Sequence, residues 1–479
     1  MSQLSADCLN EIFEYLEDDK VSLYSCLLVN RLWCEVSVRI LWINAGYISK
    51  HRRSYDVLIS CLPCESKEIL SNNGINISIS TSKPPMFNYA RFCRIISTYM
   101  VYFQVENFLK NHSSNDLINE NNIYILAQEI FKLYIKQIPS IKELAVSRFR
   151  NLPMVPFLSY PEAKESLKNL SKLTCNSNAD PELLYHLSQT CHNIHSLMVF
   201  FTTNKSNEIA DLISAQKNLK YLIIRKTSHC SNIKVLANTK LPNAHTITKL
   251  IYRDFNRYNT SLSFITKFVN LQELTLCSFM YQNTFEDFKS LQYVKFPQLQ
   301  ILTINFKTQS CEPLINFLEI NGSHLREFYL FGNNGDNSLN LAIAEYCSGL
   351  RKLCTSFKKD ELETLRIVFD GCQNLKSIAI YCGDKYLSEK EALESIAKYS
   401  HKTLCEIILH YKSNYFETTL LPEELESFFI SWKNRSSHNP LYFMVTSGES
   451  LTSNHKNMKI IEKYVKLGVV KKFKVGSDH

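Results

Sequence analysis

The chain has 479 residues, which is enough for about three average domains or one elongated array of repeats. Apolar residues make up 45% of the chain and aromatic residues 12%, so the composition indicates a globular protein and excludes a disordered one. The net charge of +8 is a small excess for this length and does not by itself demand a nucleic-acid partner.

The charges and cysteines indicate a protein of the cell interior. Asp7 and Glu11 interrupt the first apolar stretch, where a secretory signal needs an uncharged core, so we expect no signal peptide. No run of about 18 apolar residues occurs, and we expect no membrane span. The 16 cysteines are then expected to be free thiols in a reducing compartment, which is the cytoplasm, the nucleus or both.

The first 42 residues predict three short helices. Ser5 can cap the first of them, and Asp7 lies in its first turn, where the helix dipole favours a negative charge. The apolar positions with helical spacing are Leu9, Ile12, Phe13 and Leu16, then Leu23, Cys26 and Leu27, then Trp33, Val36 and Ile40. A module of about 40 residues buries too little surface to fold alone, so it must pack on a partner or on the rest of the chain.

Residues 46 to about 135 carry no repeated pattern. Paired prolines and flanking polar residues predict a turn or short linker at Ser80–Pro85. The sequence predicts helices over residues 87–109 and 121–137.

Two short motifs contain residues that can bind metals or perform redox chemistry. Cys61 and Cys64 have the spacing of a redox pair or of half a zinc site, but no second ligand pair lies nearby, so we favour two thiols on a helix face. Cys191, His192 and His195 could hold a metal together, but the alternation of the segment places His195 toward solvent. The common phosphate-binding, dinucleotide-binding and hydrolase motifs are absent from the sequence. We therefore expect no cofactor, no metal and no catalytic activity of the chain itself.

A short pattern recurs from residue 141 onward: an apolar residue, two variable residues, an apolar residue, one variable residue and a third position that is nearly always apolar. Eleven copies begin at Ile141, Leu170, Ile194, Leu219, Ile247, Leu271, Leu299, Leu325, Leu350, Leu375 and Leu404. The ten steps from Ile141 to Leu404 cover 263 residues and average about 26, within the range of about 20–29 residues for leucine-rich repeats. Eleven copies at nearly constant spacing indicate such repeats, which a single copy would not.

The pattern also makes physical sense as a repeat. Its last two apolar positions alternate toward one side of a short strand, and helical patterns such as Pro181–Leu187 and Glu391–Ala397 lie between copies. Each strand and helix has an apolar face that only its neighbours can cover, so the units stack into a curved solenoid. The predicted fold class is therefore α/β, with parallel strands on the concave side and helices outside. Leu441–Val445 and Val470–Val475 are predicted to form degenerate final units that cap the solenoid.

The N-terminal module and the repeats together resemble one protein family. The module resembles an F-box, the helical motif that docks on the Skp adaptor of SCF-type ubiquitin ligases. The residues that carry the match are Leu4, Leu9, Ile12, Phe13, Leu16, Leu23, Cys26, Val29, Asn30, Trp33, Leu41 and Trp42. Cys191, Cys347 and Cys372, each three residues before a repeat pattern, resemble the cysteine-containing repeats common in F-box proteins. Ser5 stands where the family usually has proline, which leaves the strength of adaptor docking open.

The resemblance implies a domain order of F-box (1–45), helical linker region (46–135) and leucine-rich-repeat solenoid with a degenerate cap (136–479). It implies a non-catalytic substrate-recognition subunit that joins the Skp adaptor and the cullin scaffold and presents an unknown target protein for ubiquitination. The expected adaptor contacts are Leu4, Leu9, Ile12, Phe13, Leu16, Leu23, Cys26, Val29 and Trp33. The expected target contacts on the concave strands, where aromatic side chains would concentrate binding energy, are Phe200, Tyr221, Arg225, Tyr329, Phe331 and Tyr381.

Two other functions stay open at this point. The chain could be a leucine-rich-repeat scaffold without a ubiquitin ligase role, its N-terminal helices serving only as an end cap. It could also bind nucleic acid through the lysines of its tail, although lysines without interleaved aromatic residues more often form a solvated helix face. These lysines are Lys463, Lys466, Lys471, Lys472 and Lys474. We favour the ligase subunit, and we expect neither a nucleic-acid nor a membrane partner.

Overall fold

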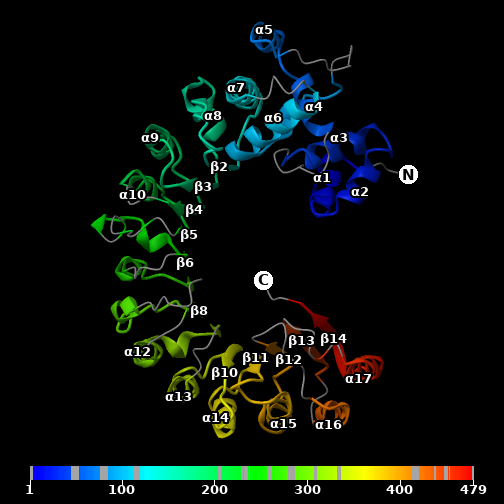
Figure 1. The fold of residues 1–479 in the computed structure, drawn as a ribbon, viewed down its shortest axis with the longest axis vertical. Helices are drawn as coiled ribbons and strands as arrows, with labels where there is room; N and C mark the ends of the chain where they lie inside the picture. Colours follow the sequence, from blue (N-terminus) through cyan, green and yellow to red (C-terminus); the bar gives the residue numbers. More distant parts are fainter. Residues whose placement is uncertain are drawn as a thin grey trace. The chain divides into compact units, whose positions relative to one another are not determined.

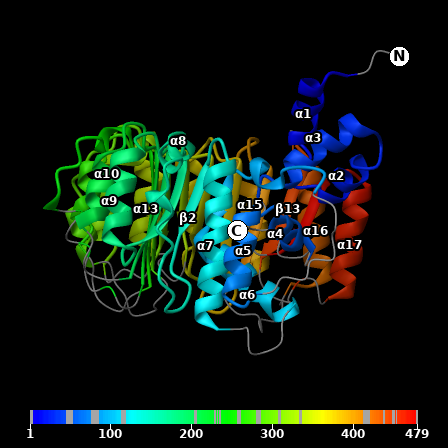
Figure 2. The same ribbon diagram turned by 90° about the horizontal axis from the view of Figure 1, so that it is seen from above.

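The computed structural model describes residues 4–44, 53–75, 85–112, 119–202, 207–227, 230, 233, 236, 238–255, 261–278, 286–306, 310–331, 336–411, 420–435, 439–446, 451 and 454–476. The chain forms two compact units, Met1–Lys220 and Tyr221–His479. Figures 1 and 2 show the helices and strands of both units in two views. None of the helices in the described ranges has the length and apolar character to span a bilayer.

The first unit begins with helices and continues into strand and helix repeats. Its helices are α1 (Ala6–Glu14), α2 (Lys20–Cys26), α3 (Arg31–Leu41), α4 (Arg53–Ser60), α5 (Cys64–Asn72), α6 (Thr98–His112), α7 (Glu120–Gln137), α8 (Ala163–Leu167), α9 (Pro181–Thr190) and α10 (Asn207–Ser214). Its strands are β1 (Ile95–Ser97), β2 (Glu143–Val146), β3 (Lys172–Asn176) and β4 (Ser196–Phe201). Single 3-10 turns lie at η2 (Tyr89–Phe92) and η4 (Phe157–Ser159).

The second unit consists of repeats throughout. Its strands are β5 (Tyr221–Lys226), β6 (Lys249–Asp254), β7 (Glu273–Ser278), β8 (Ile301–Asn305), β9 (Glu327–Leu330), β10 (Lys352–Ser356), β11 (Ser377–Cys382), β12 (Glu406–Tyr411), β13 (Leu441–Thr446) and β14 (Val470–Val475). Short 3-10 turns connect the earlier strands: η5 (Ala244–Thr246), η6 (Ser263–Lys267), η7 (Glu286–Ser290) and η8 (Gly322–His324). Helices follow: α12 (Glu312–Asn321), α13 (Asn337–Tyr346), α14 (Leu362–Gly371), α15 (Glu389–Tyr399), α16 (Pro422–Lys433) and α17 (His455–Lys466).

Within each unit the strands are parallel and follow one another in chain order. The repeat pattern sets the register, because the fourth residue of each copy pairs with the fourth residue of the next. In the second unit these residues are Leu222, Leu250, Leu274, Leu302, Phe328, Leu353, Ile378 and Ile407. Figure 1 shows the strands of this unit along the inner side of an arc and its helices along the outer side. This is the architecture of a leucine-rich-repeat solenoid, so the predicted α/β fold class is confirmed.

The core of each repeat lies between its strand and its outer segment. Strand β6 is typical: Leu250, Tyr252 and Asp254 are buried and alternate with the partly exposed Lys249 and Ile251. The alternation follows from the pleat, which directs successive side chains to opposite faces of the sheet. The inward side chains of neighbouring repeats therefore form one continuous apolar layer within the unit.

Buried amides replace cysteine at some helix ends. The Sγ of Cys372 donates to the carbonyl oxygens of Cys347 (3.5 Å) and Ile343 (3.7 Å). Gln216 occupies the same place in an earlier copy, where its Oε1 accepts from the Ile194 N–H at 3.0 Å. These contacts join the end of one outer helix to the preceding repeat, so the cysteines identified in the sequence bridge repeats as well as fill space.

The region before the repeats differs in part from the sequence prediction. Helix α7 confirms the helix predicted over residues 121–137. The helix predicted over residues 87–109 is wrong in its first half, because residues 89–92 form η2 and residues 95–97 form β1, which pairs in parallel with β2. Most of the linker predicted at Ser80–Pro85 lies outside the described residues. Strands β13 and β14 confirm the two degenerate copies predicted near the end of the chain.

Candidate protein-interaction surfaces

The N-terminal module consists of three helices whose first turns are all capped by side chains. Ser5 caps α1 through the Cys8 N–H (3.3 Å), Asp19 caps α2 through the Ser22 N–H (3.1 Å), and Asn30 caps α3 through the Trp33 N–H (2.9 Å). Caps matter here because helices this short are marginal without them. Ser5 therefore provides the cap of the first helix.

Four of the expected adaptor contacts lie inside the module instead of on its surface. Leu9, Phe13, Leu23 and Cys26 are buried, with Leu9 only 1% exposed. The Phe13 ring packs edge-on against Trp33, with ring centroids 5.1 Å apart. These side chains hold the three helices together, so in this conformation they are not available as direct contacts.

The module exposes a second set of apolar side chains, here called the N-terminal apolar surface. Of the expected adaptor contacts, Leu4, Ile12 and Val29 are exposed, Ile12 at 48%, whereas Leu16 and Trp33 are partly buried. Four further apolar residues, which helical spacing did not single out, are exposed as well. The complete set is Leu4, Ile12, Tyr15, Val21, Tyr24, Leu28 and Val29. Tyr15 is 91% and Leu28 89% exposed. Such exposure of several large apolar side chains is unusual for a surface that contacts only water.

Another side of the module packs on the first unit. The C-terminal half of α3 buries Val36, Ile40 and Leu41. Beyond it, the Ile43 carbonyl oxygen accepts from the N–H groups of Arg94 (2.9 Å) and Ile95 (3.2 Å), at the start of β1. The module is therefore anchored through Ile43 to the start of β1, while the N-terminal apolar surface is exposed in the part of the chain that the structure describes.

The outward strand face of the second unit carries an aromatic cluster, defined as Tyr329, Phe331, Tyr381, His410 and Met444. Tyr329 and Phe331 stack with centroids 6.1 Å apart, and the His410 ring stacks on Tyr381 at 5.0 Å. Phe331 meets the edge of His410 at 6.3 Å. Tyr329, Phe331, Tyr381 and Met444 pack on a small apolar base formed by Cys354, Ala379 and Ile408.

Polar groups fix this cluster in place. The Tyr329 hydroxyl donates to Glu327 at 2.7 Å, and the pKa of Tyr329 is raised by burial first and by Glu327 second, so the phenol stays protonated. Glu327 also pairs with Lys352 at 3.2 Å. His410 hydrogen-bonds Thr446 on the next strand. The cluster is thus a fixed, half-buried surface, which costs little ordering when a partner binds.

The structure brings together only some of the expected target contacts. Tyr329, Phe331 and Tyr381 belong to the aromatic cluster, which also contains His410 and Met444, two residues the sequence did not single out. Tyr221 and Arg225 lie on β5, four strands before β9 in the order of the sheet. Phe200 belongs to β4 of the first unit and is half-buried. The expected contacts therefore belong to β4 of the first unit, to β5 of the second unit and to the aromatic cluster of the second unit.

The two cysteine-containing motifs lie on α5 and at the end of α9. Cys61 and Cys64 flank the start of α5 as free thiols, and burial raises the pKa of Cys61. His195 is exposed, whereas Cys191 is buried and donates to the Leu167 carbonyl oxygen, so the two point to different environments. Among the residues that the structure describes, no group of three or more possible ligands could hold a metal ion.

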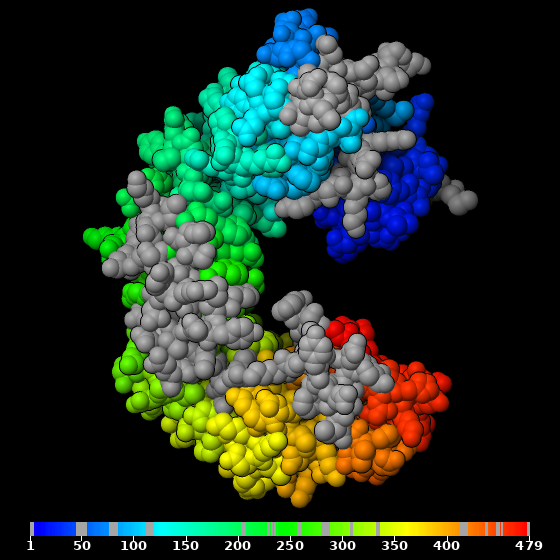
Figure 3. All heavy atoms as spheres, in the orientation of Figure 1, coloured from blue at the N-terminus to red at the C-terminus, as the bar shows by residue number. Residues whose placement is uncertain are grey.

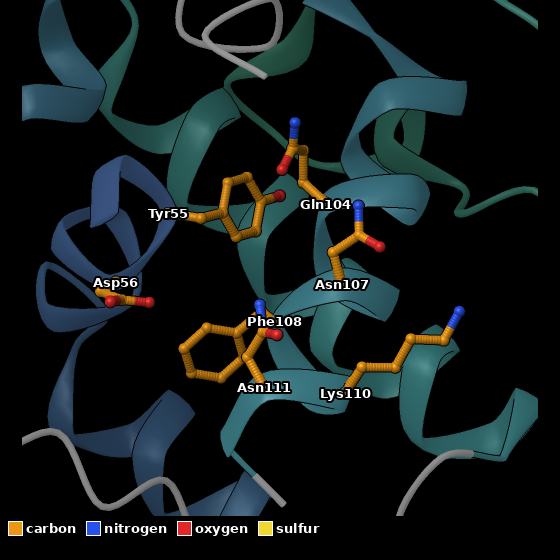
Figure 4. Close-up of a pocket in the computed structure, with 7 residues that line it drawn as sticks. All are labelled: Tyr55, Asp56, Gln104, Asn107, Phe108, Lys110 and Asn111. Atoms are coloured by element: carbon orange, nitrogen blue, oxygen red, sulfur yellow. The ribbon is translucent and has the colours of Figure 1, made fainter. Parts of the chain in front are cut away.

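A polar hollow of about 250 Å³ lies between α4 and α6 of the first unit (Figure 4). Its lining consists of Tyr55, Asp56, Gln104, Asn107, Phe108, Lys110 and Asn111. Tyr55 is held by a hydrogen bond from its hydroxyl to the Val101 carbonyl oxygen (3.4 Å). The lining offers three amides and one charge of each sign.

The basic tail is partly neutralised by its own contacts. Lys463 pairs with Glu426 and lies 5.5 Å from the Tyr464 ring centroid, and Lys471 lies 5.0 Å from that of Tyr442. The tail residues are spread over α17 and β14. The Lys463–Glu426 pair thus offsets one positive charge of the tail, and Lys471 packs against an aromatic ring.

Comparison with known proteins yields distant structural similarity only. No family model and no curated protein matches the chain. The leucine-rich-repeat-containing protein LegL7 from Legionella pneumophila is similar at 12% identity and a TM-score of 0.33, over 73% of this chain and 95% of LegL7. A structure of the Rad7 and Elc1 complex in yeast is similar at 12% identity and a TM-score of 0.38, over 88% of this chain and 97% of the matched chain. The assignment of a leucine-rich-repeat fold rests on the strand order and register of the chain itself.

Proposed function

We propose that the protein is the substrate-recognition subunit of an SCF-type ubiquitin ligase. The N-terminal module would dock on the Skp adaptor and through it on the cullin scaffold. The outward strand face would hold a target protein. The chain itself would perform no chemical step; it would raise the effective concentration of the target at the ubiquitin-conjugating enzyme.

The observation that carries this proposal is the N-terminal apolar surface. A helical module that only caps a solenoid needs one apolar face, and the C-terminal half of α3, with Val36, Ile40 and Leu41 buried, already provides it. Beside this packed face, the module leaves seven large apolar side chains exposed in the part of the chain that the structure describes. Helix-in-groove docking uses such anchors, and a few of them supply most of the binding energy.

The structure changes which residues we propose as direct adaptor contacts. Ile12, Leu4 and Val29 keep that role, and Tyr15 and Leu28 join them because they are more exposed than any of the original set. Leu9, Phe13, Leu23 and Cys26 would act indirectly, by keeping the helices in position.

Co-expression with a Skp adaptor, followed by purification of the tagged adaptor, tests the proposal. The intact chain should co-purify, and Ile12→Asp should not, because it places a charge on the docking surface. Tyr185→Asp is the matched control, since Tyr185 is an exposed aromatic residue on α9 outside the module. Equal recovery of the Ile12 and Tyr185 variants would overturn the proposed docking mode.

The alternative function is a protein-interaction scaffold without a ligase role, in which the aromatic cluster binds a partner and the module serves as an end cap. The hydrogen bonds from Arg94 and Ile95 to the Ile43 carbonyl oxygen, which hold the module at the start of β1, are compatible with it. A folded intact chain that fails to retain the adaptor would favour this alternative.

A further inference from the structure

Two arginines lie side by side on the outward strand face of the second unit. Arg225 on β5 pairs in register with Arg253 on β6, and both occupy the third outward position of their strands. Neighbouring strands are about 4.8 Å apart, so the two guanidinium groups can reach a common point in front of the sheet. Arg225 was expected from the sequence as a target contact, whereas Arg253 was not.

This juxtaposition sets two like charges close together. Burial lowers the pKa of Arg225, and the charge of Arg253 lowers it further. The Nε of Arg253 is buried and has no hydrogen-bond partner among the described residues. At the same position, β7 offers Cys277 and β8 offers Asn305, neither of which is a carboxylate.

Two carboxylates on these strands are engaged with other groups. Asp254 follows Arg253 directly, but it is buried on the other face of the sheet, 3.3 Å from the Lys226 Nζ and 3.1 Å from the Tyr252 hydroxyl. At the first outward position, Glu273 pairs with Lys249 at 2.8 Å. The first outward position therefore pairs opposite charges on neighbouring strands, whereas the third outward position places two arginines next to each other.

The aromatic cluster begins three strands away from Arg253, on β9. Three strand spacings amount to about 14 Å, which an extended peptide covers with about four residues. The strands between them, β7 and β8, present short side chains at their second and third outward positions. These are Thr275, Cys277, Thr303 and Asn305. They leave room for a peptide backbone, and Thr275, Thr303 and Asn305 can hydrogen-bond it, whereas Cys277 is buried.

We propose that this face binds an extended acidic segment of the target protein lying across the strands. One anionic side chain would sit between Arg225 and Arg253, and an apolar side chain about four residues away would rest on the aromatic cluster. The guanidinium fork suits a carboxylate or a phosphate, which accept paired hydrogen bonds. The inference rests on the proposed function in taking the strand face as the target-binding surface, and it specifies the kind of target segment.

The test uses a display library of random dodecapeptides panned on the full-length chain. Enriched peptides should contain Asp or Glu at a fixed separation of about four residues from a large apolar residue. Enrichment of basic peptides, or of apolar peptides without an acidic position, would overturn the proposal.

Variants of the arginine pair then link the selected peptide to the site. A synthetic enriched peptide should bind Arg253→Gln about 10 to 100 times more weakly than the intact chain, because a charge-assisted hydrogen-bonded contact is lost. Arg253→Lys, which keeps the charge but not the fork, should give an intermediate loss. Arg366→Gln is the matched control, since Arg366 lies exposed on α14 and pairs with Glu363. Unchanged thermal unfolding of each variant excludes misfolding as the cause.

Peptides with Glu, phosphoserine or Gln at the acidic position distinguish the source of the anion. Tighter binding of the Glu peptide assigns a carboxylate, and tighter binding of the phosphoserine peptide assigns a phosphate. Equal binding of the Gln peptide would contradict the role of the arginines. Arg253→Gln should still co-purify with the Skp adaptor, so failure of the peptide test with adaptor binding intact refutes this inference alone.

Discussion

The buried amide of Asn321 allows the repeat packing to be tested at a single side chain. Asn321 ends α12 and is fully buried. Its Oδ1 accepts from the Phe296 N–H at 2.7 Å, and its Nδ2 donates to the carbonyl oxygens of Val294 (2.9 Å) and Phe317 (3.0 Å). Asn321→Leu keeps a similar shape but removes all three hydrogen bonds. Phe296 and Val294 belong to the preceding repeat, so their backbone groups would lose the partner that joins the two repeats.

The expected cost follows from the number of groups left unsatisfied. Each buried backbone group without a partner costs about 1–3 kcal/mol, so two such groups lower the free energy of unfolding by about 2–6 kcal/mol. Asn316→Leu on the same helix is the control, because Asn316 is only partly buried and its amide donates to Gln292 at 3.2 Å. Its cost should stay within about 0.5 kcal/mol. Urea denaturation followed by circular dichroism measures both, and equal stabilities of the two variants would refute the reasoning.

Two further predictions concern buried charge and buried thiols. Lys226→Met should destabilise the protein by about 3–5 kcal/mol, because it removes the cation beside the buried carboxylate of Asp254. Lys249→Met, in a partly exposed ion pair, should cost only about 0–1 kcal/mol. Similar urea midpoints for the two variants would contradict this prediction. Burial raises the pKa of Cys372 to about 12, so its thiol stays neutral in the native state at pH values where the unfolded chain ionises, and stability should fall as pH rises from about 9 to about 12. Iodoacetamide near neutral pH should accordingly label the exposed Cys64 and leave Cys372 unmodified, and mass spectrometry showing equal labelling would rule out the burial described.

The repeats could be predicted from the sequence because their signal is both local and repeated. Leu250 and Tyr252 mark a strand only weakly, but ten other copies share their spacing, and the structure places each copy in the same register. Even the polar exception fits: Thr355 occupies an inward position and is fully buried, where its hydroxyl donates to the Asn340 side chain at 2.9 Å.

Features outside the repeated pattern could not be predicted in the same way. Strand β1 has only three residues and no copy of the pattern, and its place is set by pairing with β2, which lies more than 40 residues along the chain. The neighbouring residues 98–112 do form a helix, so helical spacing led to an overextended prediction.

The residues of the candidate sites could also be predicted only in part from the sequence. Helical spacing identifies the face that packs, and in the N-terminal module that face contains Leu9 and Phe13, which are buried. The exposed surface consists instead of residues such as Tyr15 and Leu28 that lie off the regular spacing. The aromatic cluster was anticipated in Tyr329 and Tyr381, but His410 joins it only because β12 follows β11 in the sheet.

Calorimetric titration of a purified Skp adaptor into the purified chain tests the central claim most directly. The account predicts one-to-one binding with a negative heat-capacity change, as expected for burial of apolar surface. Ile12→Asp should weaken binding by about 30-fold or more, the loss of a hot spot of about 2 kcal/mol, while circular dichroism shows the chain still folded. A folded intact chain that gives no binding heat, at several temperatures, would contradict the account and leave a repeat scaffold without a ligase role.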